Sequence, residues 1–193
     1  MTQTLTPSPE QHFIQTGVSW PQFKLIQTGF KNSPGVRLFY YKGEVEILAV
    51  SKEHELISRT INILLAIYFE VKEIEFEPTG SFNQEREGEA SAQADESYFL
   101  GSEPKTIPDL SVEVVITSGG TNKLNRYQAL GVPEVWFWED GLFRLYRLGE
   151  DGYDRIYASQ ALPKLNLELL TRCVLLTSRL EAMREFRQGL ESN

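Results

Sequence analysis

Apolar residues recur at every second position of the segment 107–117, IPDLSVEVVIT. This period-two pattern predicts a β-strand, because successive side chains of a strand point to opposite faces of a sheet. The apolar positions then share one face, while Asp109 and Glu113 lie on the other face. Buried carboxylates need a partner, a proton or a metal ion. The pattern therefore leaves two interpretations open, namely surface positions of an edge strand or a pair that binds a metal.

The first half of the chain predicts a helix, a hairpin and a longer helix. In order, apolar spacing and turn residues predict a short helix over 19–29, strands over 36–41 and 44–50 that turn at Lys42-Gly43, and the strongest helix over 51–69. Ser51 suits the N-cap of the long helix. His54 lies near the apolar face of that helix. A lone histidine in such a place is more often a hydrogen-bonded core residue than a ligand.

The second half predicts a strand, a helix and a returning strand, followed by a hairpin and a helical tail. A glutamate-rich stretch (73–100) regains β character at ADESYFL. The strand 107–117 follows, then a helix capped by Thr121 or Asn122 and ended by Gly131, and then the strand 135–138. The chain ends with a hairpin of 142–148 and 153–157 and a helix over 175–186. The central strand–helix–strand unit has the length of a βαβ crossover, or of a strand that returns beside the first. Trp136 and Trp138 favour core packing over a stacking platform for bases.

Length and composition limit the class of protein. A chain of 193 residues suits one domain, 1–193, in which residues 1 to about 10 form a flexible lead. The net charge of −8 argues against non-specific binding of polyanions, so a nucleic-acid role requires a local basic patch or a bound metal. Cys173 is the only cysteine, which suits a reducing compartment. No signal peptide or apolar run of ~20 residues is visible, and we expect a cytoplasmic protein.

Few known chemical motifs are present. The sequence has no glycine-rich phosphate loop, no G-x-S-x-G elbow and no Cys/His zinc spacing. One cysteine and two histidines make a structural zinc site improbable. Any metal would therefore be bound by oxygen, which points to Mg²⁺ or Mn²⁺.

Four segments together resemble the Uma-type family of restriction endonucleases, which carry the PD-(D/E)XK nuclease fold. They are EILAVSKEHELI, ADESYF, PDLSVEVVIT and KLNRYQALGVPEVWFW. The spacing of the last two segments is the most specific part, and the likeness is weakest before Trp20. The resemblance implies an α/β fold with a restriction-endonuclease-like mixed central sheet flanked by helices, here with a C-terminal antiparallel hairpin. It also implies a carboxylate cluster that binds a divalent cation and hydrolyses phosphodiester bonds in DNA.

The resemblance assigns roles to particular carboxylates. Asp95 in ADESY resembles the first acidic ligand, and Glu113 in SVEVV resembles the acid of the second motif. Asp109 resembles the aspartate of the PD pair that heads the strand. A further acid normally completes the cluster. Both Glu46 and Glu55 match its place, and Glu46 is favoured.

The sequence departs from the nuclease pattern at one position. The pattern has a lysine two residues after the glutamate, where this chain has Val115. Lys123, at the start of the next helix, resembles the displaced lysine of this family. In this hypothesis Asp95 and Glu113 hold the metal directly and Glu46 completes its shell. Lys123 then orients the attacking water or contacts the scissile phosphate.

Two other functional hypotheses remain, and the assembly is a separate question. The negative net charge and Val115 favour a non-catalytic interaction module that keeps the nuclease fold. A weaker third hypothesis is a metal-dependent enzyme that acts on a smaller phosphoester. Nucleases of this fold often pair to cut two strands, so we expect a homodimer, with aromatic residues of the C-terminal hairpin as its apolar surface.

Overall fold

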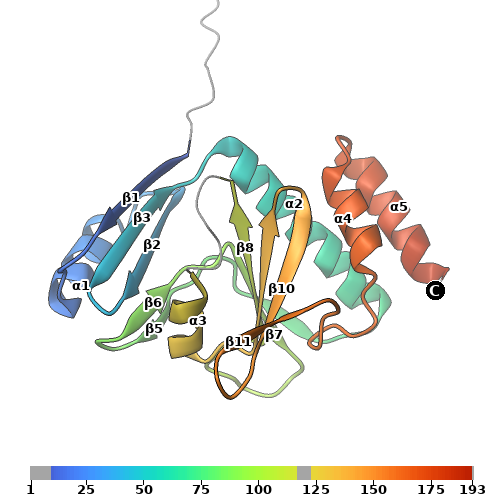
Figure 1. Cartoon of the computed structure of the whole chain (residues 1–193). Coiled ribbons are helices and arrows are strands. Elements are labelled where there is room, and N and C mark those ends of the chain that lie inside the picture. The colour runs from blue at the N-terminus through green and yellow to red at the C-terminus, as the bar shows by residue number, and fades with distance from the viewer. Residues whose placement is uncertain (1–9, 117–122, 193) are drawn as a thin grey trace, which may run out of the picture.

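The computed structural model describes residues 10–116 and 123–192, which form five helices and two β-sheets (Figure 1). The helices are α1 (Trp20–Gly29), α2 (Lys52–Val71), α3 (Leu124–Leu130), α4 (Leu167–Leu175) and α5 (Arg179–Glu191). The strands are β1 (Gln11–Gln15), β2 (Val36–Tyr41), β3 (Glu44–Ala49), β4 (Phe76–Pro78), β5 (Gln84–Arg86), β6 (Ala90–Ala92), β7 (Glu96–Leu100), β8 (Leu110–Val115), β9 (Glu134–Glu139), β10 (Leu142–Leu148) and β11 (Tyr153–Ile156).

The two sheets differ in strand direction. The five-stranded sheet has the order β1-β3-β2-β6-β5 and is antiparallel throughout. The six-stranded sheet has the order β11-β10-β9-β8-β7-β4, and its β8–β9 pair is parallel. The mixed sheet flanked by helices confirms the predicted restriction-endonuclease-like α/β fold. The five-stranded sheet is an addition that the sequence did not indicate, although it contains the predicted hairpin.

Strand β8 lies inside the six-stranded sheet, between β7 and β9. It begins at Leu110, three residues later than the sequence pattern suggested, and the interpretation as an edge strand is wrong. Val112 and Val114 face the main hydrophobic core beneath α2. Glu113 and Val115 belong to the opposite face, and the Val115 side chain packs in a second core that includes Phe39 and Tyr127. The carboxylate of Glu113 therefore lies in the interior.

The predicted hairpin and the long helix are both present, and local residues form their turn and their cap. Lys42 and Gly43 join β2 to β3 with positive φ angles of 45° and 91°, the geometry that two-residue hairpin turns require. The hydroxyl oxygen of Ser51 accepts a hydrogen bond from His54 N at 3.2 Å, which caps α2. At the start of α1, the side chain of Gln22 accepts a hydrogen bond from Ser19 N at 2.8 Å.

The strand–helix–strand unit is also confirmed, since β8 and β9 are parallel and α3 connects them. Gly131 ends α3 with a φ of 77°, a left-handed conformation that glycine adopts easily. The predicted cap at Thr121 or Asn122 lies outside the described residues. Trp136 and Trp138 are core residues, as expected.

The C-terminal region adds one helix to those predicted. The predicted helical tail is present as α5, which begins at Arg179 rather than at about Leu175, and α4 before it was not predicted. Asn166 caps α4 by accepting from Leu169 N at 3.0 Å, and Ser178 caps α5 by accepting from Glu181 N at 3.3 Å. The predicted hairpin is present as β10 and β11, with β11 at the edge of its sheet.

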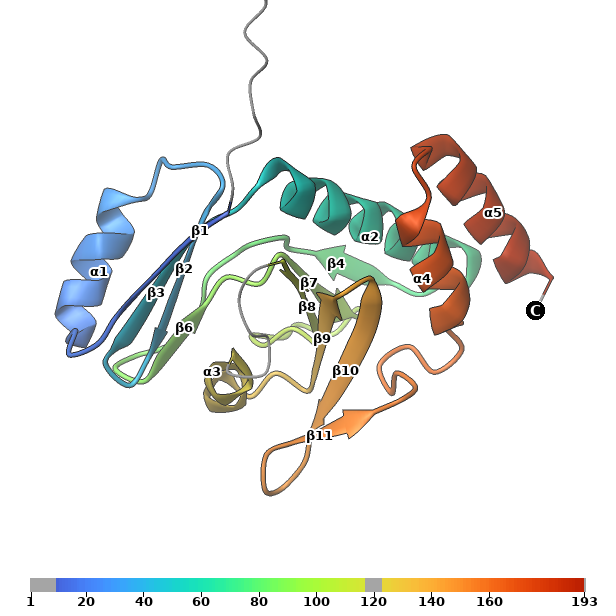
Figure 2. The same cartoon turned by 45° about the horizontal axis from the view of Figure 1, so that its top comes forward.

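The helices lie on different sides of the molecule (Figures 1 and 2). Helices α2, α4 and α5 pack on one another and cover one face of the six-stranded sheet. Helix α3 lies on the other face, where it also contacts β2, β5 and β6 of the five-stranded sheet. In the described ranges, no helix has the length and apolar character needed to cross a membrane. The space around α3 is thus bounded by both sheets.

Candidate active site

Four polar residues from four different segments meet beside α3. Glu46 comes from β3, Asp95 directly precedes β7, Glu113 lies on β8 and Lys123 directly precedes α3. Their exposed fractions are 4%, 4%, 1% and 2%, respectively. Charged side chains are almost never buried this deeply without partners, so the group requires an electrostatic explanation.

The strand register brings two of the carboxylates together. Glu96 pairs with Val112 across the antiparallel β7–β8 ladder, and the same register carried one residue further puts Asp95 opposite Glu113. Directly opposite residues of an antiparallel pair project to the same face. The backbone N–H of Val114 also donates to Asp95 Oδ2 at 2.8 Å, which holds Asp95 against β8. The two carboxylates therefore lie on one face of the sheet.

Lys123 is the cation at the centre of this group. Its Nζ lies 3.0 Å from Glu113 Oε2 and 5.0 Å from the centroid of the Phe39 ring. Burial alone would lower the pKa of Lys123. The negative charges of Glu113 and Glu46 outweigh burial and raise this pKa above its ordinary value. Lys123 is consequently a buried ammonium ion.

The carboxylate of Glu113 has two donors. Lys123 binds Oε2, and the hydroxyl of Tyr127 donates to Oε1. Burial raises the pKa of Glu113, and the Lys123 charge opposes that rise. Burial and the neighbouring Glu113 carboxylate raise the pKa of the Tyr127 phenol well above its ordinary value, so Tyr127 remains a donor.

Glu46 approaches from the five-stranded sheet. Its carboxylate pairs with Arg126 and lies 2.9 Å from His12 Nε2. Burial would raise the pKa of Glu46, but the charges of Arg126 and Lys123 lower it below its ordinary value. The guanidinium carbon of Arg126 lies 4.6 Å from the centroid of the Phe39 ring. Glu46 is therefore an ionised acid beside Lys123.

Asp95 is held by a histidine. His54 Nε2 lies 2.8 Å from Asp95 Oδ2, and His54 Nδ1 lies 2.7 Å from Glu10 Oε1. Burial would lower the pKa of His54, but its bonds to Asp95 and Glu10 raise that pKa to about 9. The His54 bond conversely lowers the pKa of Asp95, although burial alone would raise it. His54 is thus a buried core residue, as its place on the helix suggested, and also the direct partner of a candidate ligand.

Two other sequence candidates lie elsewhere. The Asp109 carboxylate accepts from Leu100 N at 2.8 Å and lies 2.7 Å from Lys105 Nζ, at the start of β8. Glu55 pairs with Arg37 at 2.8 Å and is partly exposed. The structure brings Glu46, and neither of these two residues, to the group around Lys123.

Arg126 and Tyr127 belong to the site and were missed as functional residues. Lys123, Arg126, Tyr127 and Leu130 are all buried, which is the spacing of one helix face. Two cationic residues on the buried stripe of a helix were a visible signal. Their presence predicts carboxylates opposite them, because a buried charge needs a partner.

The acids fit a divalent cation in chemical type. Carboxylate oxygens are the donors that Mg²⁺ and Mn²⁺ prefer. Among the residues that the structure describes, however, no three Asp, Glu, His or Cys side chains form a group that could hold a metal. Protein donors contact the carboxylates instead, as Lys123 and Tyr127 do at Glu113. An ion at Asp95 and Glu113 would therefore have to replace the ammonium of Lys123.

In a comparison with known protein families, the chain matches one family model. The family model Uma2, described as "Putative restriction endonuclease", matches residues 20–177. This span includes Glu46, Asp95, Glu113 and Lys123. No curated protein matches the chain.

Proposed function

The chain belongs to the Uma2 family, and from this membership we propose that it is a divalent-metal-dependent endonuclease that hydrolyses phosphodiester bonds in DNA. The observation that carries the proposal is the group of three buried acids around Lys123. Solvated surface acids do not require such a partner. Its acids would accept a divalent cation in place of the Lys123 ammonium, and buried charged groups of this kind are typical of functional sites.

The roles of the residues follow from their contacts. Asp95 and Glu113 would hold Mg²⁺ or Mn²⁺, and Glu46 would complete the shell directly or through water. When bound, such an ion supplies Lewis-acid charge and lowers the pKa of a coordinated water. Lys123, displaced from Glu113 by the ion, would keep its positive charge, which suits it to orient the attacking water or contact a phosphate oxygen. His54 and Tyr127 fix the orientation of Asp95 and Glu113.

A second candidate function is a non-catalytic interaction module with the same fold. The observation that favours it is the closed set of ion pairs, since Lys123 and Arg126 already neutralise Glu113 and Glu46. Val115 also replaces the lysine of the usual motif. In such a module the charged group would only fix the packing of α3.

The remaining proposals concern organisation. We propose one domain per chain and a homodimer, because cutting both strands of DNA requires two sites. The exposed side chain of Tyr157 on the C-terminal hairpin offers apolar area for such pairing. The single buried Cys173 fits a cytoplasmic location. Light scattering at micromolar concentration that gives only the monomer mass would contradict the homodimer.

Ion binding separates the two functions. The midpoint of thermal unfolding should rise when Mn²⁺ is added to the wild-type protein, since binding at 100 times the Kd stabilises by about 2.7 kcal/mol. The rise should be lost in Glu113→Gln, which keeps the shape but removes a ligand charge. A wild-type protein whose midpoint does not respond to millimolar Mg²⁺ or Mn²⁺ would favour the interaction module.

Glu96→Gln is the matched control. Glu96 is as buried as Glu113 but faces α2, where its carboxylate accepts from Ser58 at 3.1 Å and from Asn62 at 2.8 Å. Burial raises the pKa of Glu96. The unfolding midpoint of Glu96→Gln should therefore rise with Mn²⁺ as much as that of the wild type. A Glu96→Gln variant without this rise would mean that the response to Mn²⁺ is not specific to the site.

A further inference from the structure

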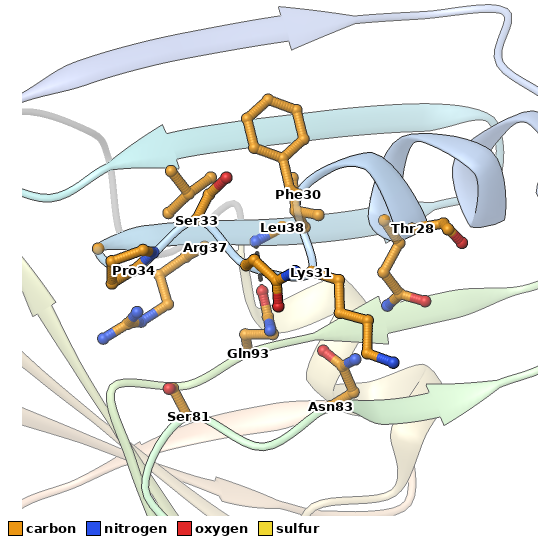
Figure 3. Close-up of a pocket in the computed structure, with 14 residues that line it drawn as sticks. Thr28, Phe30, Lys31, Ser33, Pro34, Arg37, Leu38, Ser81, Asn83 and Gln93 are labelled. Carbon is orange, nitrogen blue, oxygen red and sulfur yellow. Dashed lines mark hydrogen bonds between the residues drawn. The ribbon is translucent and has the colours of Figure 1, made fainter.

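Figure 3 shows a cavity of about 620 Å³ whose lining residue Arg37 lies 3.6 Å from Asp95 and whose other lining residues are outside the carboxylate group. Its walls come from the end of α1, from the loop between α1 and β2, from β2, and from the segments that lead into β5 and β7. Acidic residues make up 27 of the 193 residues of the chain, yet none of the described residues that line this cavity is acidic. An acid-free cavity on a chain of net charge −8 is suited to an anion.

Two cations line the cavity, of which Arg37 is already paired with Glu55 at 2.8 Å, so the free positive charge of the cavity comes from Lys31. Lys31 is exposed and, among the described residues, makes no ion pair. Arg37 is 8% exposed, and its Nε has no hydrogen-bond partner within the described ranges. The same Nε lies 3.6 Å from Asp95 Oδ1. Arg37 thus connects the cavity wall to the candidate active site.

Uncharged polar groups complete the walls. Gln93 Oε1 accepts a hydrogen bond from Leu38 N at 2.6 Å, which leaves the amide N–H groups of Gln93 to donate elsewhere. Figure 3 shows Lys31 reaching from its loop in the direction of Asn83, with Ser81 further along the same wall. Amide, hydroxyl and basic side chains are those that bind phosphate and sugar groups of nucleic acids.

We propose that this cavity is a subsite for the phosphate backbone of the DNA strand, beside the phosphodiester that is cleaved. The inference rests on the proposed function for its substrate. Gln93 lies two residues before Asp95, and Arg37 contacts Asp95, so a strand whose phosphate lies at Asp95 can continue into the cavity. The size of the cavity is within the usual range of ligand sites, about 300–1,000 Å³.

The test is binding of a fluorescent single-stranded DNA oligonucleotide in EDTA, measured by anisotropy at several salt concentrations. Lys31→Gln should reduce the slope of log K against log[salt] by about 0.7, which corresponds to an affinity loss of about fourfold at 0.15 M salt. The matched control is Lys164→Gln, an exposed lysine of the loop before α4 that should leave affinity and slope unchanged.

Gln93→Glu is a second test variant. It keeps an oxygen to accept from Leu38 N, so folding should be preserved, but it removes two donors and adds a negative charge to the cavity. The affinity for the DNA oligonucleotide should fall by more than it does in Lys31→Gln. Unchanged affinity in Gln93→Glu would overturn the subsite.

The outcomes distinguish this subsite from the proposed activity. Binding of DNA that depends on Lys31, without cleavage when Mg²⁺ is added, would support the subsite and contradict the nuclease. Cleavage with equal affinity in Lys31→Gln and Lys164→Gln would overturn the subsite and leave the nuclease intact. Binding of an RNA oligonucleotide but not of DNA would overturn the assignment to DNA.

Discussion

Loss of the ammonium of Lys123 should strongly destabilise the protein. In Lys123→Met, the Glu113 carboxylate would remain buried without its ion-pair partner, since both side chains are almost fully enclosed. Removing one member of a buried pair costs about 3–5 kcal/mol. For a chain of this size, a loss of about 3 kcal/mol lowers the melting temperature by roughly 6–12 °C.

The size of this loss should depend on pH. Without Lys123, burial should raise the pKa of Glu113 further above its value in the unfolded chain. A raised carboxyl pKa destabilises the native state above the unfolded pKa of about 4.3, and the penalty disappears when the carboxyl is protonated. The deficit of Lys123→Met should therefore shrink as the pH falls from 7 toward 5.

A double-mutant cycle supplies the control. Glu113→Gln with Lys123→Met leaves no buried charge in the pair, so the double variant should be more stable than the sum of the single losses predicts. Urea unfolding at pH 7 measures all four free energies. A loss below about 1 kcal/mol in Lys123→Met, or strict additivity in the cycle, would refute the buried ion pair.

Three further predictions concern other buried groups. His54→Gln should lower the free energy of unfolding by about 3 kcal/mol at pH 6 relative to wild type. A histidine whose pKa is raised to about 9 stabilises the native state fully below pH 6.5, and this stabilisation disappears as the pH rises through 9. Urea unfolding between pH 6 and 10 measures the difference. Glu134→Ala removes the acceptor of the backbone N–H groups of Gln160 and Ala161, so hydrogen exchange at these two amides should accelerate. Leu65→Ala, in the main core, should cost about 2–5 kcal/mol by calorimetry or urea unfolding.

The elements that the sequence predicted well are those with strong local signals. The apolar periods of β8 and α2, the cap at Ser51 and the turn at Lys42-Gly43 depend on residues close in sequence. The strands β4, β5 and β6 have three residues each, too few to show a period. Strands β5 and β6 pair with each other locally, but β4 pairs with β7 and β6 pairs with β2, and both of these partners are distant in sequence. The five-stranded sheet was therefore not predictable from local patterns.

Some residues of the candidate site could likewise be predicted from the sequence, and others could not. Asp95 and Glu113 could be named from the resemblance, and their shared face follows from the strand register. The partners that hold them could not be named. His54 is far from Asp95 in sequence, and Arg126 is far from Glu46. Only the tertiary structure therefore shows which basic residue pairs with which carboxylate. The placement of Glu46 rather than Glu55 near Lys123 likewise depends on the packing of α3.

Cleavage of supercoiled plasmid DNA in the presence of Mg²⁺ is the decisive measurement for the proposed nuclease. We expect wild-type protein and Glu96→Gln to convert the plasmid to nicked or linear forms. Glu113→Gln should leave the plasmid intact, although it should bind the labelled oligonucleotide and unfold cooperatively. EDTA should abolish the wild-type reaction. A wild-type protein that leaves the plasmid intact in Mg²⁺ and in Mn²⁺, or a Glu113→Gln variant that cleaves at the wild-type rate, would contradict a metal-dependent nuclease at this site.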